Sequence, residues 1–161
     1  DEAQHQADRG VLSVHLYADG TQAESLSIPA GGSRYPTSEK TLADGQHFIH
    51  MAGKVIFTHA VRNLASACQA ALKHQGLRPS DIDLVVAHQA NLRIVEAVAQ
   101  RLELPMEKFF INIDKYGNTS SASVPIALDE AVRAGRVRPG DRLLFCALGA
   151  GLAWGAACVR W

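Results

Sequence analysis

Two segments of this chain carry side chains that can stabilise a negatively charged oxygen. The first, His-Gln-Ala-Asn-Leu-Arg at residues 88–93, opens on His88, and the second, Tyr-Gly-Asn-Thr-Ser-Ser-Ala-Ser at residues 116–123, contains Asn118. An imidazole and an amide can both donate hydrogen bonds to one carbonyl oxygen, and fixed donors of this kind stabilise an oxyanion. His88 and Asn118 are therefore candidate catalytic residues.

Each candidate also has a purely structural interpretation. A histidine that follows an apolar strand can be a satisfied structural residue, and asparagine is among the best helix N-caps. The serines at positions 120, 121 and 123 favour a functional interpretation. Serine suits a polar site or a closely packed helix better than an exposed helix interior.

The glycine-rich turn Gly149-Ala150-Gly151 is a third candidate. Its spacing differs from that of a dinucleotide-binding loop, and a predicted strand rather than a helix follows it, which excludes nucleotide binding. Exposed backbone N–H groups in such a turn can form part of an oxyanion hole. The alternative is a plain hairpin turn. The chain has neither the GxSxG motif of serine hydrolases nor the HExxH motif of zinc proteases.

Apolar patterning places these residues where predicted strands end and helices begin. Short apolar runs alternate with amphipathic segments, which predicts an α/β fold with a parallel or mixed sheet covered by helices. Ligands collect at the carboxyl ends of strands in such sheets. The predicted strands are 11–16, 84–87, 109–113, 141–148 and 152–161, the last two paired antiparallel, and the predicted helices are 46–74, 91–104 and 118–135.

We divide the chain at residue 45. Residues 1–45 are a connecting strand and a long loop rich in Gly, Ser, Thr and Pro, and residues 46–161 hold the candidate site. A long loop of this kind is often functional or lies against another unit. The polar first residues predict neither a signal nor a transit peptide, and the apolar runs are too short for a transmembrane helix.

Charge and cysteine content narrow the function classes. The chain carries 16 basic and 16 acidic residues, so we expect neither a nucleic-acid nor a membrane partner. Residues 51–101 carry six basic and three acidic side chains, which suits either an anionic partner or a solvated helix face. Cys68, Cys146 and Cys158 lack disulfide or metal-ligand spacing, so we expect no metal site and a reducing, cytoplasmic compartment.

Taken together, these motifs resemble the C-terminal half of β-ketoacyl-acyl carrier protein synthase III. The resemblance rests on the segments at 88–93 and 116–123 and on Leu-Gly-Ala-Gly-Leu-Ala-Trp-Gly-Ala-Ala at 148–157, and it extends to residues 15–20 and 51–53. It implies a thiolase-like five-layer α-β-α-β-α sandwich. Residues 46–161 would be its C-terminal catalytic half-domain, and the N-terminal half would lie outside this chain.

The resemblance also implies a reaction. Members of the family use a Cys-His-Asn triad, to which His88 and Asn118 correspond, and the backbone of Ala150 corresponds to an oxyanion donor. The nucleophilic cysteine belongs to the N-terminal half, so this chain alone lacks it. The complete enzyme condenses acyl-coenzyme A with malonyl-acyl carrier protein, with loss of carbon dioxide, to start type II fatty acid synthesis. No cofactor beyond these substrates is implied, and the complete enzyme is expected to be a homodimer.

Further positions match the family's binding residues. Those matching the pantetheine-binding region are Met51, Gly53, Phe57, Ala90 and Asn91. Those matching the region linked to the acidic acyl carrier protein are Gln89, Ala90, Asn91, Leu92, Arg93, Lys54 and Arg101. The chain departs from some relatives at Thr58, where they carry a lysine for the carrier protein, and Lys54 lies one turn earlier.

Three alternatives share these motifs. The first is a related condensing enzyme of polyketide or quinolone biosynthesis. The second is a non-catalytic partner subunit of a heterodimeric condensing system, which the presence of both His88 and Asn118 disfavours. The third is a thioester hydrolase or acyltransferase, which does not need Asn118 as a second enolate donor.

Overall fold

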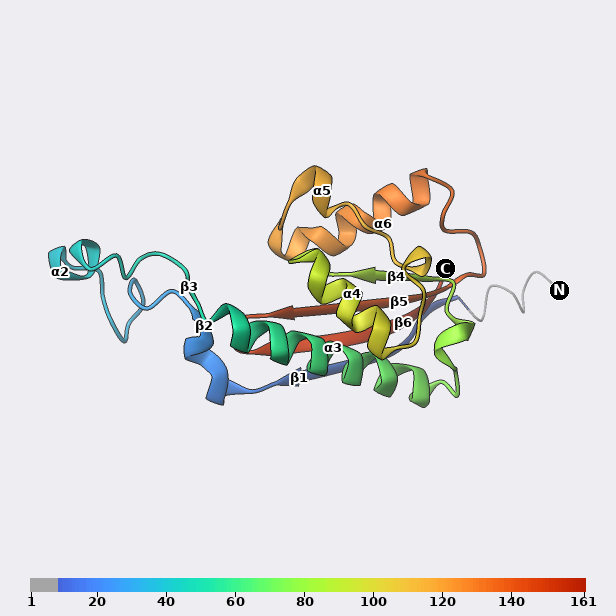
Figure 1. The fold of residues 1–161 in the computed structure, drawn as a ribbon, viewed down its shortest axis with the longest axis horizontal. Helices are drawn as coiled ribbons and strands as arrows, with labels where there is room; N and C mark the ends of the chain where they lie inside the picture. The colour runs from blue at the N-terminus through green and yellow to red at the C-terminus, as the bar shows by residue number, and fades with distance from the viewer. Residues whose placement is uncertain (1–8) are drawn as a thin grey trace.

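The computed structural model describes residues 9–161, which form a mixed sheet with helices on both faces (Figure 1). The order across the sheet is β1-β6-β5-β4. Strands β4 and β5 are parallel, and β6 is antiparallel to both β5 and β1. The four strands are β1 (Gly10–Ala18), β4 (Leu84–Ala87), β5 (Arg142–Gly149) and β6 (Ala153–Arg160).

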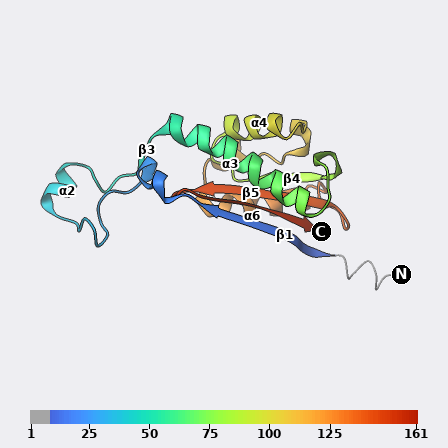
Figure 2. The ribbon, with the colours of Figure 1, turned by 90° about the horizontal axis from the view of Figure 1, so that it is seen from below.

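Helices pack on the sheet in two layers, which Figure 2 shows edge-on. Helices α3 (Gly53–His74) and α4 (Leu92–Arg101) cover one face, and α6 (Ser123–Arg133) covers the other face next to β4. The apolar stripe of α3 packs into the larger core through residues such as Ala67, Cys68 and Ala71. The mixed α/β sheet predicted from the sequence is therefore confirmed, as is the antiparallel pairing of the last two strands.

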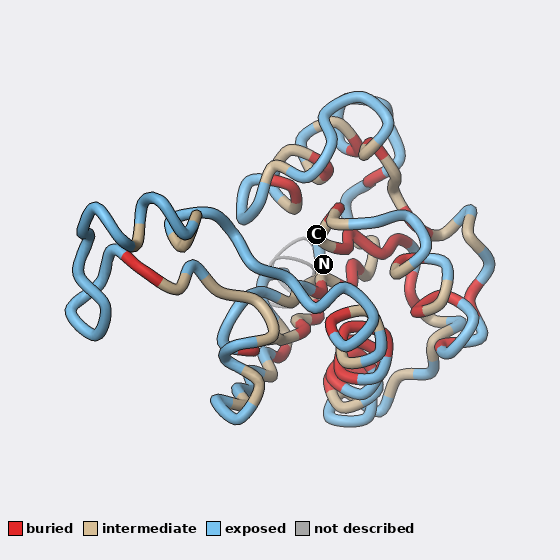
Figure 3. The backbone as a smooth tube through the Cα atoms, turned by 60° about the vertical axis from the view of Figure 1, so that its left-hand side comes forward, coloured by how far each residue is buried: buried red, intermediate tan, exposed pale blue. Residues whose placement is uncertain are grey.

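An arm formed by residues 20–52 projects from the sheet (Figure 1). The long loop predicted over residues 20–45 contains short elements that local hydrogen bonds stabilise. They are a 3₁₀ turn at Gly20–Ser25, β2 (Leu26–Ser27) and α2 (Glu39–Ala43). Strand β2 pairs with β3 (His50–Met51). Figure 3 shows the arm mostly exposed, with intermediate stretches and a buried one at Ala30.

Two predicted helices begin later in the structure. The helix expected from residue 46 starts at Gly53, because residues 50–51 are extended and pair with β2, so Gly53 opens the helix rather than bending it. The helix expected from residue 118 starts at Ser123, after a 3₁₀ turn at Ser120–Ala122. Helix α4 ends earlier than predicted, because Glu103 adopts a positive φ of 55°.

The segment 109–113 is not a strand. It makes one bridge, between Phe109 and Val85, and then turns into the short helix α5 (Ile113–Tyr116). The apolar run Phe109-Phe110-Ile111 resembles a buried strand in composition. Its backbone leaves the sheet after the Phe110 N–H donates to the carbonyl of Val85 at 3.0 Å.

Among residues 9–161, the β1 edge of the sheet is covered on one face only. Strand β1 lies at the edge, and alternate side chains point to opposite faces: His15 packs edge-on against His74 of α3, whereas Leu16 is 78% exposed. None of the helices among residues 9–161 is long and apolar enough to cross a membrane. The prediction about a leader peptide falls on residues 1–8, outside the described part of the chain.

Candidate active site

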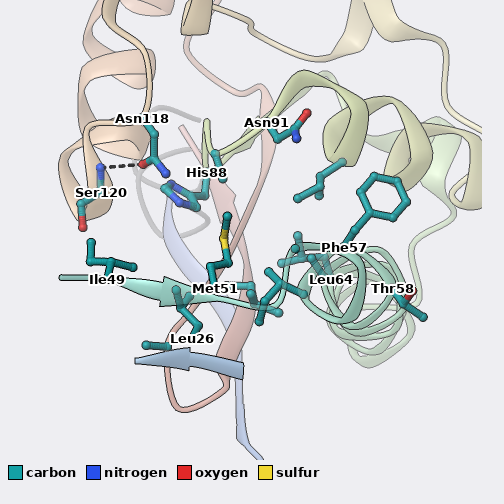
Figure 4. Close-up of a pocket in the computed structure, with 18 of the residues that line it drawn as sticks. Leu26, Ile49, Met51, Phe57, Thr58, Leu64, His88, Asn91, Asn118 and Ser120 are labelled. Carbon is teal, nitrogen blue, oxygen red and sulfur yellow. Dashed lines mark hydrogen bonds between the residues drawn. The ribbon is translucent and has the colours of Figure 1, made fainter. Parts of the chain in front are cut away.

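An open groove of about 1380 Å³ runs between the arm, α3 and the carboxyl ends of β4 and β5 (Figure 4). It brings together side chains that are far apart in the sequence. Of the residues singled out from the sequence, those lining it are Met51, Gly53, Lys54, Phe57, Thr58, His88, Ala90, Asn91, Arg93, Asn118, Ser120, Gly149 and Ala150. Its remaining surface is mainly apolar, from residues such as Leu26, Ile49 and Leu64.

His88 follows β4 and is fixed by a serine. Its backbone N–H donates to the carbonyl of Cys146 at 2.8 Å, which continues the hydrogen bonding between β4 and β5. Its ring Nδ1 lies 2.5 Å from Ser123 Oγ. The backbone N–H of Gln89 donates to the same serine oxygen at 3.2 Å. The serine oxygen keeps a second lone pair, and its hydroxyl proton is free to point at Nδ1. In that arrangement the ring proton lies on Nε2, which becomes a donor.

The protonation state of His88 agrees with this arrangement. The ring is half-buried, and desolvation lowers the pKa of His88 below its usual value. Burial disfavours the charged imidazolium, so the ring is neutral at pH 7. A neutral imidazole with its proton on Nε2 can stabilise a developing oxyanion without first releasing a proton.

Asn118 reaches the groove from a tight turn. Gly117 adopts φ 66° before it, a conformation that favours glycine. The side-chain oxygen of Asn118 accepts the backbone N–H of Ser120 at 2.9 Å, which directs the amide NH₂ away from that turn. In Figure 4 Asn118 and His88 point into the same end of the groove. Two neutral donors therefore converge there.

The glycine-rich turn forms another wall of the groove, through Gly149 and Ala150. The backbones of Asp19 and Leu152 exchange two hydrogen bonds, at 2.8 and 2.9 Å, which tie the turn to the end of β1. Gly151 has φ 134°, so this position requires glycine. The oxyanion role of the Ala150 N–H stays a prediction.

The predicted binding residues divide into two groups. Ala90, Asn91 and Arg93 reach the groove, with Asn91 also capping α4 through a 3.0 Å bond from the Arg93 N–H to its side-chain oxygen. Leu92 and Arg101 do not line it. Both are exposed, Arg101 at the far end of α4.

The expectation that Gln89 binds the carrier protein is not supported. Its side chain is only 1% exposed, and its amide bonds to the carbonyls of Ala87 and Phe110 and to the N–H of Asn112. A buried amide must satisfy its polar atoms inside the fold. The sequence could not show this, because two of the three partners, Phe110 and Asn112, come from a segment more than 20 residues away.

Sequence reasoning missed most of the apolar wall and the specific role of Ser123. The unassigned lining residues include Leu26, Ile28, Ile49, Ile56, Leu64 and Ile94. In the sequence, the serines that follow Asn118 were the only indication of further polar residues at the site. The structure places Ser120 at the groove and Ser123 in hydrogen-bond contact with His88.

The three cysteines lie in the larger core rather than in the groove. Cys68 is fully buried, and its pKa is raised, chiefly by a hydrogen bond with Cys146 and by desolvation. Burial likewise raises the pKa of Cys158. A nucleophilic cysteine needs an accessible thiolate, and none of these three provides one.

The sheet, its helical layers and the His-Asn edge define a thiolase-like α/β domain. The solved 3-oxoacyl-[acyl-carrier-protein] synthase III of Aquifex aeolicus VF5 matches it with a TM-score of 0.84 and 40% identity, over 96% of this chain and 45% of that one. The priming β-ketosynthase of the R1128 polyketide biosynthetic pathway matches with a TM-score of 0.80 and 34% identity, over 94% and 45%.

A sequence model described as 3-oxoacyl-[acyl-carrier-protein (ACP)] synthase III C terminal matches residues 72–161. The chain belongs to this family, as the resemblance predicted. The β-ketoacyl-[acyl-carrier-protein] synthase III of Roseiflexus sp. (strain RS-1) is 52% identical over 152 residues, which make up 94% of this chain and 46% of that protein. The chain thus spans about half the length of the curated relatives it matches.

Proposed function

We propose that the protein containing this chain is a β-ketoacyl-acyl carrier protein synthase III. It condenses acyl-coenzyme A with malonyl-acyl carrier protein and starts type II fatty acid synthesis. The observation that carries the proposal is the convergence of the His88 imidazole and the Asn118 amide at one end of an apolar groove. Family membership and similarity to relatives of that name support it.

The first half-reaction is acyl transfer to a cysteine of the N-terminal half. The thiolate attacks the thioester carbonyl of acyl-coenzyme A, and the coenzyme A thiolate leaves and takes up a proton. A new thioester on the enzyme results. This chain supplies no nucleophile for the step, because its three cysteines are buried.

The second half-reaction uses this chain's donors. Malonyl-acyl carrier protein loses carbon dioxide, and the electrons of the broken C–C bond form an enolate whose oxygen accepts hydrogen bonds from His88 Nε2 and the Asn118 amide. The enolate carbon then attacks the acyl-cysteine, and the cysteine thiolate leaves. The N–H of Ala150 stabilises the intervening oxyanion. Removing one such donor typically raises the barrier by about 2.7–4 kcal/mol.

The groove is where we place the pantetheine arm, against Met51, Gly53, Phe57, Ala90 and Asn91. Its mouth carries the exposed cations Lys54 and Arg93. These steer an acidic carrier protein, since complementary charge increases the rate of association. Thr58 is uncharged and does not replace the lysine that some relatives carry at this position. Its hydroxyl donates to the Lys54 carbonyl at 3.0 Å within α3.

The N-terminal half is the proposed partner for the uncovered sheet face around Leu16. The complete protein is proposed to be a cytoplasmic homodimer. A second candidate function is priming in polyketide synthesis, favoured by the 34% identity with the R1128 priming ketosynthase. The two differ in the carrier protein that accepts the product, so an assay with each carrier protein separates them.

The test uses the full-length protein. Incubation with acyl-coenzyme A should add one acyl mass to a cysteine outside this chain, read by intact mass under denaturing conditions. His88→Ala and Asn118→Ala should each keep that acylation and lose malonyl decarboxylation, measured as release of carbon dioxide. A wild-type rate in either variant, or acylation of Cys68, Cys146 or Cys158, would contradict the proposal.

A further inference from the structure

The helix that precedes Asn118 has little to hold it in place. Helix α5 spans four residues, Ile113–Tyr116, and none of them is buried. A single turn of helix is unstable by itself, because nucleation fixes several residues for each hydrogen bond formed. The position of Asn118, two residues later, must therefore depend on contacts made by the α5 side chains.

Those contacts converge on one carboxylate, that of Glu130 in α6. Tyr116 donates its hydroxyl to Glu130 Oε1 at 2.8 Å, and Asn112, at the N-cap of α5, donates its amide to Oε2 at 2.8 Å. Lys115 adds an exposed ion pair at 3.3 Å, which contributes little by itself. The bond from Asn112, followed by that from Tyr116, holds the pKa of Glu130 below its usual value. The carboxylate is therefore charged at neutral pH.

The same contacts connect α5 to the strand that carries His88. Asn112 is 2% exposed, and its backbone N–H donates to the Gln89 side chain at 3.3 Å. Glu130 lies seven residues after Ser123, hence on the same face of α6. Ser123 contacts His88, and Glu130 contacts α5. The face of α6 that carries Ser123 and Glu130 thus contacts both His88 and the α5 turn that precedes Asn118.

We propose that Glu130 is a positioning residue for Asn118: its carboxylate fixes the α5 turn and so sets where the Asn118 amide lies relative to His88. The inference rests on the proposed function, because it assigns Glu130 to the decarboxylation step. Hydrogen bonds to an ionised carboxylate are stronger than neutral ones. A glutamine at this position has one oxygen, so Asn112 or Tyr116 would lose its acceptor.

The experiment compares Glu130→Ala and Glu130→Gln in the full-length enzyme, with Asp129→Ala as the matched control. Asp129 precedes Glu130 in α6, but its carboxylate bonds to Arg133. We expect Glu130→Ala to lower kcat for malonyl decarboxylation by roughly 10- to 100-fold, since small misplacements of reacting groups have effects of that size. Glu130→Gln should lose less. Cysteine acylation should stay unchanged in all three variants.

A double-variant cycle separates positioning from general stability. If Glu130 acts through Asn118, adding Glu130→Ala to Asn118→Ala should lower the residual decarboxylation no further. An additional loss there, or an equal loss in both half-reactions, would overturn the proposal. If Glu130→Ala does not fold, Tyr116→Phe removes one bond to the carboxylate. It should lower decarboxylation selectively, and a wild-type rate would overturn the proposal.

The outcomes also distinguish this inference from the proposed function. Loss of activity in Asn118→Ala with a wild-type rate in Glu130→Ala would overturn the positioning role and leave the proposed function intact. A wild-type enzyme that does not decarboxylate malonyl-acyl carrier protein would overturn both.

Discussion

At the residue scale, the chemistry of His88 depends on a single hydroxyl. Ser123 Oγ lies 2.5 Å from Nδ1 and also accepts the N–H of Gln89. This pair of contacts fits the tautomer with its proton on Nε2, in which the hydroxyl donates to Nδ1. The serine is itself buried, because it is the first residue of α6, which packs against β4.

We predict that Ser123→Ala in the full-length enzyme lowers malonyl decarboxylation by roughly 10- to 100-fold, because the imidazole loses its fixed tautomer and orientation. ¹⁵N NMR of the His88 ring should show a proton on Nε2 in the wild type and a mixture in the variant. Ser121→Ala is the matched control, since the Ser121 side chain is exposed. A pure Nε2–H tautomer in Ser123→Ala would contradict the prediction.

The lowered pKa of His88 determines the direction in which the stability of the folded protein changes with pH. Because desolvation lowers its pKa in the folded protein, the unfolded chain takes up a proton first as the pH falls. The stabilisation from neutral His88 is therefore complete above about pH 6.5, the usual histidine value. It is lost as the pH falls from there toward the lower folded pKa. The NMR titration midpoint of the folded protein should lie below that usual value.

At the element scale, α4 presents a cation where helix electrostatics disfavours one. Asn91 caps the helix, and Arg93 lies in its first turn at the mouth of the groove. Positive side chains are favourable near helix C-termini and unfavourable near N-termini. Stability of α4 therefore gives no reason for an arginine here, whereas binding of an anionic partner does.

We predict that Arg93→Glu raises KM for malonyl-acyl carrier protein about tenfold, because charge complementarity is lost, while the thermal unfolding midpoint stays equal or rises. A malonyl thioester of free pantetheine should react as in the wild type. Lys73→Glu makes the same charge change in the last turn of α3, away from the groove, and should leave KM unchanged. Equal effects of the two variants would show that only net charge matters.

At the scale of the whole molecule, no element among residues 9–161 covers one face of the sheet at its β1 edge. Val14 is 54% exposed and Leu16 is 78% exposed, both on the edge strand β1. Exposed apolar patches mark interaction surfaces, and burying them is favourable by about 25 cal/mol per Å². The family's missing N-terminal half is the partner we propose for this face.

We predict that Leu16→Asp weakens capture of a separately expressed N-terminal half by this chain, because a buried unpaired charge is unfavourable. Co-purification of the two polypeptides is the measurement. Val55→Asp, on the outer helix α3 with 40% exposure, is the matched control. Undiminished capture by Leu16→Asp would place the interface elsewhere.

The sequence by itself determined the features that rest on local patterns. The alternation of short apolar runs and amphipathic segments predicted the α/β class, the strand Leu84–Ala87 and the antiparallel last pair. Motif spacing identified the family, and most of the residues it singled out line one groove. Such features depend on residues close together along the chain, so composition and periodicity reveal them.

Only the tertiary structure decided which polar side chains are available. Gln89 lies in a motif of candidate binding residues, but its side chain is buried and bonds to Phe110 and Asn112, which lie 21 and 23 residues later in the chain. Nothing in the sequence distinguishes Glu130 from an ordinary helix residue, yet its carboxylate accepts hydrogen bonds from Asn112 and Tyr116. The stretch 109–113 has strand composition but leaves the sheet. Long-range contacts set these outcomes, and no local pattern encodes them.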